Sequence, residues 1–116
     1  MKPTGIGKLL RVFIGESDRS GHRPLFEVIV RTAKERGLAG ATVLRGVEGF
    51  GANSRQIHTA KILRLSEDLP VIVEIVDTEA GIRAFLPELD ELIERSGGGA
   101  LVTLEQVEVL HYGPGA

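Results

Sequence analysis

The chain has 116 residues, enough for one domain with one hydrophobic core, and we expect residues 1–116 to form a single domain. Its 14 basic and 16 acidic residues give a net charge of −2, so it lacks the basic excess that drives binding to nucleic acid. The absence of cysteine excludes a disulfide framework, a thiolate zinc site and a cysteine nucleophile. No run approaches the ~18 apolar residues of a membrane span, and no signal peptide is evident, so we expect a cytoplasmic protein.

The first half of the chain predicts a strand, a helix and a second strand. Residues 8–15 alternate apolar side chains between two faces, as a half-buried strand does. After a polar turn, residues 24–37 place apolar side chains at helical spacing, with Pro24 suited to the first helical position and Gly37 to the position past the end. The short, β-branched stretch 41–48 predicts the next strand.

The second half repeats the strand, helix and strand order. Residues 71–77 (VIVEIVD) are the strongest strand signal in the chain. Thr78 offers an N-cap to a helix with a long apolar stripe, in which Pro87 is expected to cause a kink or a restart. Residues 101–112 predict a last strand, and its apolar alternation changes phase at residues 105–106, which suggests a β-bulge.

This order, β-α-β-β-α-β, predicts an α+β fold of the ferredoxin-like type, a four-stranded antiparallel sheet with two helices on one face. Residues 71–77 carry apolar side chains on both faces of their strand. The helix-free face of the sheet therefore needs a cover as well, and neighbouring subunits are the natural one. The pattern predicts a homo-oligomer.

Short motifs spread over the chain resemble those of PII signal-transduction proteins. These are GLAGATV at 37–43, GFG at 49–51, His58-Thr59, Leu69-Pro70 and EIV at 74–76. With IGESDR at 14–19 and ILRLSEDLP at 62–70, the chain more closely resembles the PII-like group known as domain-of-unknown-function family 190, over roughly residues 8–112. The motifs occur in the family's order across one whole domain.

This resemblance implies a homotrimer of ferredoxin-like subunits with ligand clefts between neighbours. In PII proteins the segment after GFG is a long loop that contacts target proteins, and the loop after the second helix holds the phosphates of adenine nucleotides. The corresponding segments here are residues 49–61 and 96–100.

The chain also departs from the PII pattern. PII proteins have a Gly-Asp-Gly-Lys type of loop where this chain has residues 97–100, Gly-Gly-Gly-Ala, so the lysine that would pair with phosphate is missing. An apolar residue of the 71–73 run replaces the third-strand lysine, and residues 111–113 replace the paired arginines of the last strand. Phosphate would have to be held by backbone N–H groups in a glycine nest, which argues against a tight triphosphate site.

The ligand-binding candidates lie in these two segments. They are Gly49, Gly51, Arg55, His58 and Lys61 in the 49–61 loop, and Gly97, Gly98 and Gly99 in the glycine nest. The GFG segment completes neither a Rossmann nor a Walker motif, so its glycines are expected to serve a turn or bulge where the strand leaves the sheet. Three interpretations of the loop stay open: a polar connection, a contact surface for a partner or anion, and catalysis by His58.

Other constellations carry less weight. Ser17, Asp18 and His22 share one turn, but a catalytic triad needs a base oriented by a buried carboxylate, so turn and helix-cap chemistry is the simpler interpretation. His22, His58 and His111 are dispersed without helical metal-ligand spacing, so we predict no metal site.

Two classes of function remain. The first is a non-enzymatic, PII-like regulatory protein that senses a small ligand, with an adenine nucleotide as the candidate, in the subunit clefts and signals through the 49–61 loop. Arg19 or Arg23 could reach such a ligand across a subunit boundary. The alternative is a CutA-like or ion-homeostasis protein acting on divalent cations. Some members of the resembled family are encoded beside fluoride-channel genes, so a regulated protein or a membrane-transport protein is a candidate partner.

Overall fold

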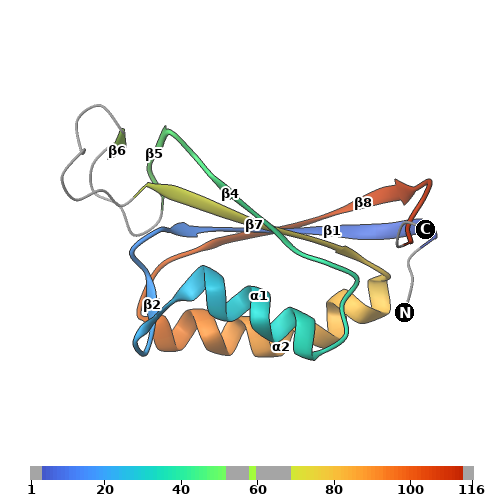
Figure 1. Ribbon diagram of the computed structural model, residues 1–116, viewed down its shortest axis with the longest axis horizontal. Coiled ribbons are helices and arrows are strands. Elements are labelled where there is room, and N and C mark those ends of the chain that lie inside the picture. Colours follow the sequence, from blue (N-terminus) through green and yellow to red (C-terminus); the bar gives the residue numbers. More distant parts are fainter. Residues whose placement is uncertain (1–3, 52–57, 60–68, 114–116) are drawn as a thin grey trace.

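The computed structural model describes residues 4–51, 58–59 and 69–113. Its main sheet has four antiparallel strands in the order β4-β7-β1-β8, and both helices cover the same face (Figure 1). This arrangement confirms the predicted ferredoxin-like fold. The elements of this two-layer unit are β1 (Gly5–Gly15), α1 (Leu25–Glu35), β4 (Thr42–Arg45), β7 (Pro70–Asp77), α2 (Glu79–Ser96) and β8 (Leu101–Val109).

Two small hairpins lie outside the main sheet. One joins β2 (Arg19–Ser20) to β3 (Arg23–Pro24), and the other joins β5 (Glu48–Gly49) to β6 (His58–Thr59). The first hairpin turns at Gly21, whose φ of +63° suits the first central position of a two-residue hairpin turn. The predicted polar turn before α1 is thus a hairpin, and the predicted strand 41–48 is divided between β4 and β5.

The core lies between the sheet and the helices because the helix-side face of the central strands is mostly apolar. In β1, Leu10 lies opposite Ile75 of β7, and Val12 lies opposite Val73. All four side chains are fully buried, which confirms the predicted alternation in this strand. The helices complete the core with Leu25, Ile29, Ala33, Ile82, Phe85, Leu89 and Leu92.

Helix α1 begins and ends close to the predicted positions. Pro24 is the residue before the helix, one position earlier than predicted, and also belongs to β3. Gly37 takes a φ of +78° and donates its N–H to the carbonyl of Lys34, as a glycine that ends a helix does.

Helix α2 is one continuous element, so the predicted restart at Pro87 is wrong. Pro87 removes one backbone donor, but its side chain is exposed, while Phe85 and Leu89 on either side are buried against the core. Burial of these side chains holds both halves of the helix to the sheet.

Thr78 is the predicted N-cap of α2, and its Oγ1 accepts the N–H of Gly81 at 3.1 Å. Thr78→Ala is expected to lower the free energy of unfolding by about 1 kcal/mol, because that N–H loses its acceptor. Urea denaturation measures the change. Thr78→Ser is the matched control, since serine keeps the capping oxygen; an equal loss in both variants would contradict the capping role.

The predicted bulge in the last strand is wrong. β8 pairs with β1 without interruption from Leu101 to Val109. The phase change arises because Val102 faces the helices, whereas Val107 lies on the other face of the sheet, and β1 and β8 extend past the end of the helix layer (Figure 1). Beyond that end, the helix-side positions have no helix above them and are exposed, so a polar residue such as Glu108 can stand there.

Candidate functional site

The glycine nest and the base of the 49–61 loop lie at the same end of the sheet. Leu101, which follows the nest, pairs with Phe13 near the end of β1. Pro70 pairs with Gly15 at that same end, and a Cβ on Gly49 would lie 3.2 Å from the Pro70 ring. Two segments separated by almost fifty residues are therefore brought to one edge of the molecule (Figure 1).

The loop candidates divide into described and undescribed residues. Gly49 pairs with His58 between β5 and β6, while Gly51 has open space around its α-carbon. The backbone of His58 is described, but its side chain and the whole of Arg55 and Lys61 lie outside the described residues.

Gly46 is a residue that sequence reasoning missed at this base. Its N–H donates to the Pro70 carbonyl at 2.7 Å, and a Cβ on Gly46 would lie 2.8 Å from the Pro70 ring. Both Gly46 and Gly49 therefore allow the chain to pass closely over Pro70. The only sequence signal was an isolated glycine within a β-type stretch, which indicates close backbone approach.

The glycine nest follows the last turn of α2. Gly97 takes a φ of +74° and donates its N–H to the Glu94 carbonyl at 3.1 Å, and the Gly98 N–H donates to Ser96 Oγ at 3.2 Å. Within the described part of the chain, the N–H groups of the next two residues, Gly99 and Ala100, have no acceptor. Two successive backbone donors are thus available to an anion.

An ion pair fixes the neighbouring connection. Arg45 at the end of β4 pairs with Glu16, which follows β1, and the Glu16 N–H donates to the Leu69 carbonyl at 2.8 Å. Asp18 Oδ2 accepts the Gly15 N–H at 3.0 Å. These contacts give Asp18 a turn-forming role, in agreement with the interpretation of this segment as turn chemistry.

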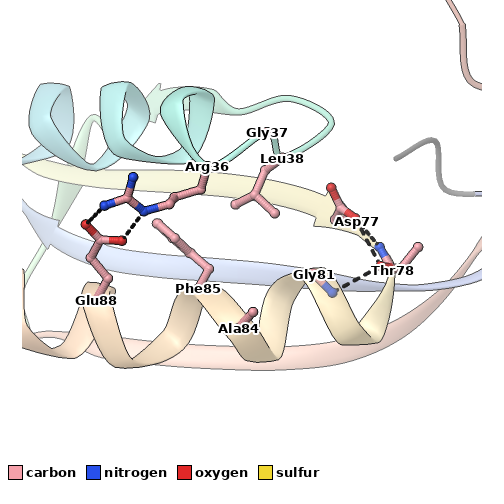
Figure 2. A pocket seen from close by; sticks show the side chains of 9 residues that line it. All are labelled: Arg36, Gly37, Leu38, Asp77, Thr78, Gly81, Ala84, Phe85 and Glu88. Atoms are coloured by element: carbon pink, nitrogen blue, oxygen red, sulfur yellow. Dashed lines mark hydrogen bonds and ion pairs between the residues drawn. The ribbon is translucent and has the colours of Figure 1, made fainter.

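The opposite end of the subunit contains a pocket of about 290 Å³ between the end of α1 and the start of α2 (Figure 2). Arg36 makes a two-pronged ion pair with Glu88, at 2.6 and 2.7 Å, on one side of this pocket. The hydrogen bonds that Arg36 donates to the Glu88 carboxylate raise the pKa of Arg36. Since each charge has its partner, this side offers no free ionic group.

Asp77 lies at the other side of the pocket and is 2% exposed. One carboxylate oxygen accepts the Ala39 N–H at 2.7 Å, and the other accepts the N–H and the hydroxyl of Thr78 at 2.6 and 3.2 Å. Asp77 therefore joins the α1–β4 connection to the start of α2. Its bonds are structural, and sequence reasoning did not single it out.

The helix-free face of the sheet is largely apolar. Arg11 lies at its centre and pairs with Glu74 at 2.9 Å and Glu105 at 2.5 Å. The hydrogen bonds that Arg11 donates, first to Glu74 and then to Glu105, raise the pKa of Arg11. We call this surface the open face. It consists of the ion-paired cluster of Arg11, Glu74 and Glu105 and of the apolar side chains around that cluster, which are Leu9, Phe13, Leu44, Ile72, Val76 and Leu101.

Neither a metal cluster nor a membrane-spanning helix is found among the described residues. In this part of the chain, no three side chains of the metal-binding types gather into one cluster. None of its helices is both long and apolar enough to cross a membrane.

Solved structures of other proteins share this fold. CPII from Thiomonas intermedia K12, a nitrogen regulatory PII-like protein bound to ADP, AMP and bicarbonate, superposes with a TM-score of 0.68 and 13% identity over 91% of this chain and 90% of that one. A PII-like protein from Thermus thermophilus gives a TM-score of 0.64 and 19% identity over 91% of each chain. The fold is that of the PII-like proteins.

Sequence comparison identifies the family. Residues 7–109 match DUF190, described as "Uncharacterized ACR, COG1993". A UPF0166 protein from Aquifex aeolicus (strain VF5) is 40% identical over 104 residues, which cover 90% of this chain and 93% of that protein. The chain therefore belongs to the DUF190 family, and the resemblance stated from its motifs is confirmed.

Proposed function

We propose that this protein is a non-enzymatic PII-like regulator, a homotrimer that senses an adenine nucleotide in clefts between subunits and signals through the 49–61 loop. The observation that carries the proposal is the position of the glycine nest and the loop base at the same end of a PII-like fold. A ligand held by the N–H groups of Gly99 and Ala100 would lie at the same end of the sheet as the start of the loop, so its binding could change the loop's conformation.

The choice of ligand rests on chemistry and on a relative. Gly99 and Ala100 offer two successive N–H donors that have no acceptor among the described residues, and such donors suit an oxyanion such as phosphate. CPII, which shares the fold, is bound to ADP and AMP in its structure. We therefore place an adenine nucleotide first among the candidates. The cytoplasm, where such nucleotides are available, is the compartment that the proposal requires.

Trimerisation is proposed from the open face. Leu44 and Leu101 are 45% and 57% exposed in the single chain, although both belong to this apolar surface. Exposed patches of this kind are usually covered by a partner. A trimer packed through the open face would also create the clefts in which the nest of one subunit meets its neighbour.

Thermal stability with and without ligand tests the proposal. ADP, AMP or ATP at a hundredfold excess over its dissociation constant is expected to stabilise the protein by about 2.7 kcal/mol. Gly98→Val should remove this shift because a branched side chain crowds the nest. Gly40→Val is the matched control, since Gly40 lies in the α1–β4 connection with open space around it.

The outcomes separate the two classes of function. If nucleotide raises the thermal stability of Gly40→Val but not that of Gly98→Val, the nucleotide sensor is supported. A response only to divalent cations or fluoride would overturn it in favour of the ion-homeostasis alternative. Hydrolysis of the nucleotide by the purified protein, lost in His58→Ala, would contradict a non-enzymatic role.

A further inference from the structure

The β2–β3 hairpin is a basic projection at the same end of the subunit as the glycine nest. β2 contacts α2, and the hairpin lies beside the C-terminal end of that helix, from which the nest follows (Figure 1). The tip carries Arg19, His22 and Arg23, and all three are exposed. The hairpin therefore presents cationic groups close to the two free N–H donors.

Arg19 and Arg23 differ from most other arginines because they have no ionic partner among the residues that the structure describes. Arg11, Arg36, Arg45, Arg83 and Arg95 each pair with a glutamate. Among the described residues, neither Arg19 nor Arg23 makes an ion pair or a side-chain hydrogen bond. The carboxylate of Glu16 next to the hairpin is already engaged by Arg45. The positive charge of the tip is thus not neutralised by these neighbours.

The nest needs such a charge for a physical reason. The nest follows the C-terminal end of α2, where unpaired carbonyl groups give the helix end a partial negative charge. That end of a helix repels an anion, in contrast to the helix N-termini that commonly hold phosphate. Two backbone N–H groups must act against this field, and an arginine guanidinium can offset it while donating to phosphate oxygens.

We propose that the β2–β3 hairpin is the cationic half of the ligand site, and that Arg19 and Arg23 bind the phosphoryl group whose other oxygens are held by Gly99 and Ala100. This inference rests on the proposed function and deepens it, because it names the residues that recognise the charged part of the ligand. The hairpin and the nest would hold a phosphorylated small molecule from two sides.

The hairpin geometry predicts that the two arginines contribute unequally. Arg19 pairs with Pro24 across the hairpin, whereas Arg23 pairs with Ser20, so the two arginines lie on opposite faces of it. Only one face of a hairpin can be turned toward the nest of its own subunit. The other arginine would then bind the ligand from the side of a neighbouring subunit.

Calorimetric titration of the full chain with ADP, adenosine and pyrophosphate tests the inference. The double variant Arg19→Ala/Arg23→Ala is expected to bind ADP and pyrophosphate about tenfold or more weakly, since charge-assisted hydrogen bonds are lost. Its affinity for adenosine should stay within about twofold, because adenosine has no phosphoryl group. The single variants should differ from each other.

Arg31→Ala is the matched control, because Arg31 is exposed on α1 and also lacks an ion pair within the described part of the chain. If the double variant binds ADP as Arg31→Ala does, or loses ADP and adenosine equally, the inference is overturned while the nucleotide sensor stands. If wild type binds pyrophosphate but not ADP, and the double variant loses pyrophosphate, the site stands and the nucleotide function fails. Binding of neither by wild type overturns both.

Discussion

Asp77→Ala is expected to lower the free energy of unfolding by about 2–4 kcal/mol, one of the largest losses from a single polar side chain. The carboxylate is 2% exposed and accepts the backbone N–H groups of Ala39 and Thr78. Alanine would leave the Ala39 N–H without its acceptor and would weaken the start of α2. Urea denaturation of the purified protein measures the loss.

Asp90→Ala is the matched control for this change. Asp90 is exposed on α2 and has no hydrogen bond among the described residues, so its loss should cost less than about 0.5 kcal/mol. Gly81→Ala tests the same network from another side, because a Cβ on Gly81 would lie 2.7 Å from a carboxylate oxygen of Asp77. A loss in Asp77→Ala no larger than in Asp90→Ala would show that the contacts contribute little to stability.

The local patterns of the sequence were sufficient for the fold. Alternation in residues 8–15 and 71–77 placed the buried side chains correctly, because strand periodicity depends only on neighbouring residues. The N-cap at Thr78 and the helix end at Gly37 were likewise local signals. The predicted bulge in β8 failed because its phase change depends on where the helix layer ends, which is a property of the tertiary structure.

The candidate site was less accessible to such reasoning. The glycine-rich sequence of residues 97–99 and 49–51 was visible, but their meeting at one end of the sheet depends on strand register. The bond between Asp77 and Ala39 joins residues 38 positions apart and has no local signature. The sequence of the β2–β3 hairpin predicted only a polar turn. The contact between β2 and α2 is therefore seen only in the structure.

Leu101→Glu is expected to convert the proposed trimer into single chains. Leu101 is 57% exposed in the single subunit, so a glutamate there can remain solvated and the fold should persist. In a trimer packed through the open face, the same carboxylate would be buried beside apolar side chains such as Phe13, at a cost of several kcal/mol for each copy. Light scattering coupled to size exclusion measures the mass, and circular dichroism verifies the fold.

Ala80→Glu is the control, because it adds the same charge at an exposed position on α2, in the layer opposite the open face. It should keep three times the mass of one chain, as wild type is expected to do. If Leu101→Glu is still a trimer, the interface lies on another surface. If the wild type has the mass of a single chain, there are no clefts between subunits. In that last case the hairpin and the nest of one subunit would have to hold the phosphoryl group without a neighbouring subunit. The affinities of Arg19→Ala and Arg23→Ala would then show which face of the hairpin binds it.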